Sequence, residues 1–293
     1  MKSFSIRSFI VFACVLAFSS WAASQSAQKN LGNLNLIKSD LIVPEPVDGE
    51  PGPGKRVRQS NPGYAGWNLY HVLYLPPNWK PGEKYPVLVE YPGNGGYENR
   101  LGDISTGRVE DCKLGYGISG GKGMIWVSLP FVNPQTKQHQ LNWWGDADAT
   151  AAYCRQTVRR ICEEYGGDSN AVILTGFSRG AIACGYIGLR DDETAKLWRA
   201  MLPHSHFDGV RQWDYPASDA QSARQRLARF AGKPQFISHE LSVEETRSYL
   251  QGTDLSPITF LALPYPNHSD QWVLKDLPER QQVRGWLAEV LKK

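Results

Sequence analysis

Residues 172–181 read VILTGFSRGA, an apolar run followed by Gly-Phe-Ser-Arg-Gly. The run is typical of a buried strand, and the AIACGYIGL that continues from it is typical of a buried helix. Ser178 would then stand on a sharp strand-to-helix turn, where Gly176 and Gly180 let the two elements pass closely. The pattern also arises by chance in a chain with 28 glycines. The flanking sequence therefore has to support a nucleophile at Ser178.

Strand-like runs and helical spacing alternate along the chain. Between residues 150 and 165, and again between 283 and 291, apolar residues recur at helical spacing. The alternation predicts an α/β fold with a mostly parallel sheet and helices on both faces, formed by one domain over residues 61–293. Ligands of such sheets bind at the carboxyl ends of the strands. Seven strands are predicted, at 69–75, 86–91, 124–129, 171–176, 199–204, 235–239 and 258–263.

The N-terminus has the order of a secretory signal. MKSFSIR is basic, FIVFACVLAF is apolar but too short to span a bilayer comfortably, and SSWAAS supplies small residues. We predict a signal peptide over residues 1–23, with an uncleaved membrane anchor as the alternative. The Pro- and Gly-rich residues 24–60 then form an extended lead-in. The protein should be secreted or periplasmic, with no membrane partner after cleavage.

Charge and cysteines narrow the class of protein further. The formal net charge is +3 without a concentrated basic stripe, so a nucleic-acid partner is not expected. Signal cleavage would leave Cys112, Cys154, Cys162 and Cys184, an even number that predicts disulfides in an exported chain. Cys154 and Cys162 would lie about 12 Å apart on one helix, too far to bond. Pairing would then use Cys112 and Cys184, or all four would remain buried thiols.

A nucleophile needs a base, and His268 is its candidate. It lies in LALPYPNHSDQW, and of six histidines it alone follows the last predicted strand. The chain order of a hydrolase, Ser then acid then His, requires a histidine there. A structural histidine in a turn is the alternative.

The acid is expected after the preceding strand, in PQFISHELSVEETRSYL. Ser242 and Glu245 have the spacing of a capping box, so a helix should start near Val243 and use the carboxylate of Glu245 itself. Glu244 falls in the first turn of that helix. Glu240 remains free to orient an imidazole, and we prefer it as the acid.

An oxyanion would need two backbone donors. The N–H of Arg179, directly after the nucleophile, is one. The N–H groups of Asn94 and Gly95, in EYPGNGGYENR, are candidates for the second, although the segment also has the composition of a plain turn. The Arg179 side chain is expected to meet either Asp208 or a substrate carboxylate.

A second polar group is found in MLPHSHFDG. His204, His206 and Asp208 alternate at a strand end, which would place them on one face. They suit an open zinc site, a reserve acid at Asp208, or a polar pocket wall in which His206 contacts substrate. No fourth ligand stands out, so we favour the wall and predict no metal and no cofactor.

The long segment NPQTKQHQLNWWGD should overhang the site. Trp143 and Trp144 would offer a face to a sugar or an aromatic acid, with Lys137 and His139 adding polarity. The alternative is that at least one tryptophan is packed in the core. No large insertion follows Ser178, so an open cleft suited to a polymer-linked ester is expected.

Together these residues resemble the α/β-hydrolase superfamily over roughly residues 69–291. GFSRG corresponds to the nucleophile elbow, PGNGG to the oxyanion loop, and Glu240 and His268 to the acid and base. The chain is most similar to secreted esterases and depolymerases of the feruloyl, acetyl-xylan and polyhydroxybutyrate type. Its oxyanion loop is not the HGGG of many lipases and esterases, and its acid is Glu where Asp is more common. The resemblance implies a serine hydrolase acting on a polysaccharide-linked or polyester substrate. A peptidase of the prolyl-oligopeptidase type and a silent carbohydrate-binding module are the alternatives.

Overall fold

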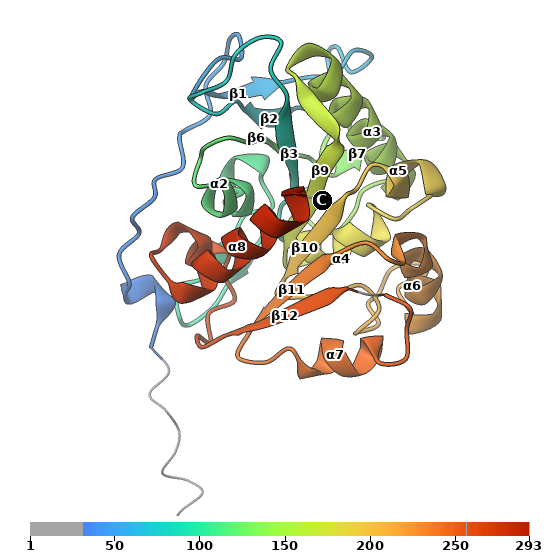
Figure 1. Cartoon of the computed structure of the whole chain (residues 1–293). Helices are drawn as coiled ribbons and strands as arrows, with labels where there is room; N and C mark the ends of the chain where they lie inside the picture. The colour runs from blue at the N-terminus through green and yellow to red at the C-terminus, as the bar shows by residue number, and fades with distance from the viewer. Residues whose placement is uncertain (1–31, 256, 293) are drawn as a thin grey trace, which may run out of the picture. The chain divides into compact units, whose positions relative to one another are not determined.

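The computed structural model describes residues 32–255 and 257–292 (Figure 1). The predicted signal peptide and its cleavage site lie outside these residues. Among the helices described, none combines the length and apolar character that crossing a membrane requires. Residues 33–293 group as one compact unit.

An eight-stranded sheet organises this unit, in the order β1-β2-β6-β3-β9-β10-β11-β12. β1 and β2 run antiparallel to their neighbours, and the strands from β6 to β12 are parallel. All seven predicted strands occur, so the predicted mostly parallel sheet is confirmed. The strands are β1 (Arg56–Gln59), β2 (His71–Tyr74), β3 (Tyr85–Tyr91), β6 (Ile125–Ser128), β9 (Gly167–Phe177), β10 (Ala200–His204), β11 (Gln235–Glu240) and β12 (Ile258–Leu263).

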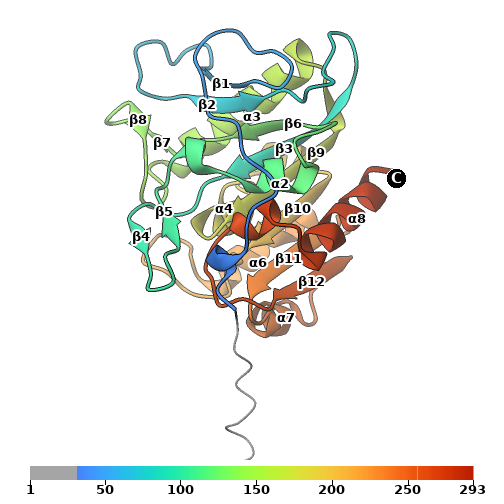
Figure 2. The same ribbon diagram turned by 90° about the vertical axis from the view of Figure 1, so that its left-hand side faces the viewer.

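Helices cover both faces of the sheet because the strand residues alternate between two apolar cores (Figures 1 and 2). In β3, Val87 and Val89 join the core that contains residues of α3 and α4, whereas Leu88 joins the core that contains residues of α2 and α8. The fully buried apolar strands match this two-sided cover. The helices are α2 (Leu114–Ser119), α3 (Ala147–Glu164), α4 (Arg179–Tyr186), α5 (Asp192–Lys196), α6 (Ala220–Leu227), α7 (Glu244–Leu250) and α8 (Pro278–Lys292).

The structure places part of the predicted extended lead-in, residues 24–60, within the folded unit. Leu34 is fully buried, and its N–H donates to Oδ1 of Asn267 at 2.7 Å. Arg56–Gln59 forms β1, which pairs with β2 as the outer strand of the sheet. The sequence hid this strand because RVRQ carries two charges. Arg56 is nevertheless buried, with its guanidinium 4.5 Å from the ring centre of Trp126.

The predicted disulfides are also corrected. Cys112, Cys154, Cys162 and Cys184 are all free, and all but Cys162 are buried. Cys154 and Cys184 belong to one core, and Cys162 packs against it, while Cys112 belongs to the core on the other face of the sheet. The sheet therefore lies between Cys112 and its expected partners.

Candidate active site

Ser178 lies on the turn between β9 and α4 with φ 54° and ψ −115°, a conformation that non-glycine residues seldom adopt. Its N–H donates to the carbonyl of His204 at 2.9 Å, which ties the turn to β10. A Cβ at Gly180 would overlap the carbonyl of Tyr91, and one at Gly176 would overlap the carbonyl of Gly180. Both positions therefore need glycine, as the elbow pattern predicts.

Ser178, His268 and Glu240 form one hydrogen-bonded series. The Oγ of Ser178 lies 2.9 Å from Nε2 of His268, and Nδ1 of His268 lies 2.6 Å from Oε1 of Glu240. Glu240 ends β11, and His268 follows β12, so the sheet brings their strand ends toward the turn after β9. The arrangement can move a proton from Oγ to Nε2 while the carboxylate holds Nδ1–H.

Glu240 is ionised at this site. Burial opposes its ionisation, but the hydrogen bond and positive charge of His268 outweigh burial and lower the pKa of Glu240 to about 2. The predicted capping box beside it does not form. Ser242 Oγ accepts the N–H of Glu244 at 3.2 Å, and Glu245 instead pairs with Arg211 at 3.2 Å. Helix α7 still begins after Glu240, so this carboxylate stays outside it.

Asp208 is not placed as the acid of this series. Its two carboxylate oxygens accept hydrogen bonds from Nε and Nη2 of Arg226 at 2.9 and 3.0 Å. Both side chains are buried. The predicted alternation along one face fails because β10 ends at His204 and Ser205 has φ 75°. The reserve assignment is therefore wrong on geometric grounds.

The two histidines of this segment also separate. His204 is buried, with Nδ1 2.9 Å from Ser238 Oγ, and burial lowers its pKa to about 4. His206 lies against His268, with ring centres 5.3 Å apart, and burial followed by the charge of His268 lowers its pKa to about 3. In the part of the chain that the structure describes, no cluster suited to a metal ion occurs. His206 thus contributes a neutral ring beside the base.

The two nominated oxyanion loops differ in what they offer. The N–H of Gly95 donates to the carbonyl of Leu141 at 2.9 Å, so Gly95 is corrected as a donor. Among residues 32–255 and 257–292, no acceptor is found for the backbone N–H of Asn94 or of Arg179. These two N–H groups can serve an oxyanion, Arg179 at the N-terminus of α4 and Asn94 in the loop after β3.

The Arg179 side chain does not meet Asp208. It is 1% exposed, and its Nη1 donates to the carbonyl of Trp143 at 2.5 Å. The guanidinium carbon lies 4.0 Å from the ring centre of Phe131. This contact pattern carries no sequence signal, because residues 131 and 143 are remote from 179 in the chain.

The two predicted substrate tryptophans have different environments. Trp144 is 6% exposed and packs on Phe131 and Tyr186, with ring centres 5.5 and 4.9 Å apart, so its assignment as a substrate contact is corrected to core. Trp143 is 36% exposed and lies 5.2 Å from Trp213. Trp213, which the sequence analysis missed, in turn lies 5.6 Å from His206.

Trp143, Trp213, His206 and His268 therefore form a row of rings, each in contact with the next. Trp213 and His206, the two middle rings of this row, also line a cavity of about 190 Å³ together with Glu240. His239 and Arg211 add polar groups to its wall. The predicted His139 lies elsewhere, where its Nε2 accepts the N–H of Tyr70 at 3.1 Å.

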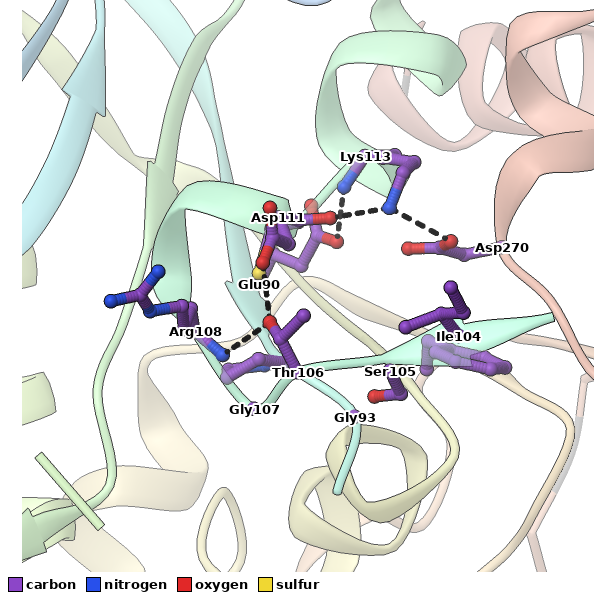
Figure 3. A pocket seen from close by; sticks show the side chains of 13 residues that line it. Glu90, Gly93, Ile104, Ser105, Thr106, Gly107, Arg108, Asp111, Lys113 and Asp270 are labelled. Carbon is purple, nitrogen blue, oxygen red and sulfur yellow. Dashed lines mark hydrogen bonds and ion pairs between the residues drawn. The ribbon is translucent and has the colours of Figure 1, made fainter. Parts of the chain in front are cut away.

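A polar cluster that includes Glu90, Lys113 and Asp270 lines a pocket next to Gly93, in the loop after β3 (Figure 3). Glu90 accepts backbone N–H groups at the start of α2, from Lys113, Leu114 and Gly115 at 3.0, 3.0 and 2.8 Å. Burial raises the pKa of Glu90 to about 7 against these hydrogen bonds. Lys113 also pairs with Asp270 at 3.4 Å. The cluster anchors both α2 and the segment just beyond His268.

The sequence matches no protein-family model and no curated protein. Solved structures do resemble the chain. A thermostable esterase is 17% identical, covering 80% of this chain and 62% of its own, with TM-score 0.50. A mutant of the feruloyl esterase module from Clostridium thermocellum, complexed with sinapinate, is 16% identical, covering 86% and 94%, with TM-score 0.51. The AtxE2 isopeptidase is 14% identical, covering 82% and 40%, with TM-score 0.52.

The chain thus spans less than two thirds of the first esterase and of the isopeptidase. At these identities the likeness concerns the fold. Together with the sheet described above, it shows that the chain adopts the α/β-hydrolase fold.

Proposed function

We propose that the protein is a serine hydrolase that cleaves carboxylic esters. The observation that carries the proposal is the series Ser178–His268–Glu240, joined at 2.9 and 2.6 Å. A hydroxyl, an imidazole and a carboxylate in this order activate a nucleophile, orient its base and stabilise the imidazolium that forms.

Acylation begins when Ser178 Oγ attacks the acyl carbon of the ester. Its proton passes to Nε2 of His268 as the carbonyl π electrons move to oxygen and form a tetrahedral oxyanion. When the oxyanion collapses, the bond to the alcohol oxygen breaks. That oxygen takes the proton from His268, which leaves Ser178 acylated.

Deacylation repeats these steps with water. His268 takes a proton from water as the water oxygen attacks the acyl carbon, and Oγ then departs with that proton. The carboxylic acid is released, and Ser178 is restored. Glu240 stays ionised throughout because its low pKa favours the carboxylate beside imidazolium. The N–H groups of Arg179 and Asn94 hold the oxyanion in both halves.

The ester is proposed to be linked to a polysaccharide or to belong to a polyester. Two features support this substrate class: the exposed ring of Trp143, which offers an aromatic face, and the cavity of about 190 Å³ that Glu240, His206 and Trp213 line. The likeness to a feruloyl esterase module supports an ester, and the likeness to an isopeptidase keeps peptide cleavage as the second candidate. A silent binding module has no need for a strained serine hydrogen-bonded to an imidazole.

Labelling with a fluorophosphonate, followed by peptide mass spectrometry, tests the nucleophile. We expect the adduct on Ser178 in the wild type, none in Ser178→Ala, and full labelling in Ser128→Ala, which alters a buried serine of β6. An intact fold without label on Ser178 would end the proposal. The rates of hydrolysis of p-nitrophenyl acetate and of a peptide p-nitroanilide are then compared. Faster hydrolysis of the ester indicates an esterase, and faster hydrolysis of the anilide indicates a peptidase.

Export remains a proposal that rests on residues 1–23. It is tested by expressing the full chain in a bacterium and sequencing the N-terminus of the periplasmic product. A start near residue 24 supports export. Retention of Met1 in the cytoplasm contradicts it.

A further inference from the structure

Arg179 is a buried cation, and among residues 32–255 and 257–292 no carboxylate pairs with it. Its Nη1 donates to two carbonyls, those of Trp143 at 2.5 Å and Gln140 at 3.4 Å, and its guanidinium stacks over Phe131. Nε and Nη2 find no acceptor among the described residues. Burial lowers its pKa to about 9, so the group is still charged at neutral pH. Such a charge is costly for stability, and its contacts indicate what it holds in place.

The segment that accepts hydrogen bonds from Arg179 is also hydrogen-bonded to the loop after β3. Trp143, whose carbonyl accepts Nη1 of Arg179, donates its own N–H to Oδ1 of Asn94 at 2.7 Å. Leu141 accepts the N–H of Gly95 at 2.9 Å. Residues 141–143 therefore join the two elements that carry the proposed oxyanion donors, the start of α4 and the 94–95 loop.

The backbone of residues 141–143 is tightly constrained by its neighbours. Trp143 has φ 52°, which a non-glycine residue keeps only where its surroundings fix it. A Cβ at Gly107 would overlap the carbonyl of Leu141, and a Cβ at Gly95 would lie 2.8 Å from Oδ1 of Asn142. Three loops are thus stacked at backbone contact distance, and a shift at Trp143 would pass directly to Asn94.

We propose that the Arg179 side chain is a positioning residue for the oxyanion hole. It holds residues 141–143 so that the N–H of Asn94 stays in register with the N–H of Arg179. This inference rests on the proposed function, since it assigns a role within that same hydrolytic site. It predicts that losing the guanidinium weakens transition-state binding more than substrate binding.

The chain offers a matched control in Arg56. This arginine is also buried, stacks on Trp126, and donates to backbone carbonyls, those of Glu110 at 2.7 Å and Val109 at 3.0 Å. It lies on β1 and touches neither the 141–143 segment nor the loop after β3 through any hydrogen bond. Arg56→Met should lower stability and leave kcat near the wild-type value.

The experiment compares Arg179→Met, Arg179→Lys and Arg56→Met in steady-state hydrolysis of p-nitrophenyl acetate and in the rate of fluorophosphonate labelling. For Arg179→Met we expect kcat and the labelling rate to fall roughly 100-fold, the scale of losing one oxyanion donor, with KM within about threefold. Arg179→Lys should have a kcat about tenfold higher than that of Arg179→Met. A kcat for Arg179→Met equal to that of Arg56→Met, with both folded by near-ultraviolet circular dichroism, would overturn the inference.

Asn94→Ala tests the other end of the link should Arg179→Met not fold. It removes the Oδ1 acceptor of Trp143 and keeps the backbone N–H. The double variant Asn94→Ala/Arg179→Lys should lose less than the product of the two single losses, because both act through Trp143. Losses that multiply would overturn the link. An unlabelled, inactive wild type would instead refute the proposed function.

Discussion

Glu240 and Asp208, the two carboxylates considered for the acid, should respond in opposite ways to neutralisation. Glu240→Gln keeps the size of a side chain that contacts His268 at 2.6 Å, whereas Asp208→Asn breaks a buried two-bond pair with Arg226. The first change should abolish activity in a folded protein. The second should unfold the protein more readily and spare the activity of what remains folded.

The magnitudes follow from the two environments. The pKa of Glu240 lies at about 2 against an ordinary 4.5, which corresponds to about 3 kcal/mol in favour of the carboxylate beside His268. That alone is on the order of 100-fold in rate. An amide also favours the wrong imidazole tautomer, so the total loss in kcat should approach about 10⁴-fold. For Asp208→Asn, leaving Arg226 unpaired should cost about 3–5 kcal/mol of the free energy of unfolding.

The assay measures kcat on p-nitrophenyl acetate and urea denaturation for both variants under identical conditions. We expect Glu240→Gln to keep a near-wild-type midpoint and Asp208→Asn to keep kcat within about threefold per folded molecule. A folded Asp208→Asn that has lost activity would refute the geometric assignment of the acid. Near-wild-type rates in both variants would remove both carboxylates from the mechanism.

Three further predictions concern stability and the substrate wall. Burial lowers the pKa of His71 to about 3 and of His204 to about 4, so the stability that these neutral histidines contribute is full above pH 6.5 and is lost as the pH falls. Near pH 5, each histidine should lower the free energy of unfolding by about 1.4 kcal/mol per pH unit. In urea denaturation measured over a series of pH values, His71→Gln should reduce this slope by the contribution of one histidine; an unchanged slope would contradict the lowered pKa of His71. Gly180→Ala, whose Cβ would overlap Tyr91, should yield little folded protein by size-exclusion chromatography, and a wild-type yield would contradict the tight elbow. Trp144→Ala should lower the free energy of unfolding by about 3–5 kcal/mol, while Trp143→Ala should chiefly raise KM for a polymer-linked ester; the reverse pattern would contradict the exposure of the two rings.

The strands were predictable because each is a short apolar run whose meaning does not depend on distant residues. β1 was missed since its pattern alternates arginine with apolar or amide residues. The buried charge of Arg56 is accounted for by contacts that the sequence does not show, with the ring of Trp126 and with the carbonyls of Glu110 and Val109. Disulfides were predicted from the number of cysteines, which says nothing about the sheet that separates Cys112 from the rest.

The candidate site shows the same division. Ser178, Glu240 and His268 follow strands whose order is local information, so their meeting could be expected from the chain order. Other features depend on pairings across the fold. Asp208 turns to Arg226, and Gly95 uses its N–H on Leu141. No spacing in the sequence encodes such partners.

The four cysteines among the described residues are free thiols, so their reactivity reports on opening of the fold. Burial raises the pKa of Cys154 to about 12, so almost no thiolate is present at neutral pH, and a thiol reagent can react there only after the core has opened. Cys162 on α3, which is only partly buried, should react first. The order and rates of modification would therefore show in which order the cores on the two faces of the sheet open, without any probe being introduced. Reductants should leave that order unchanged, because the four described cysteines form no disulfide.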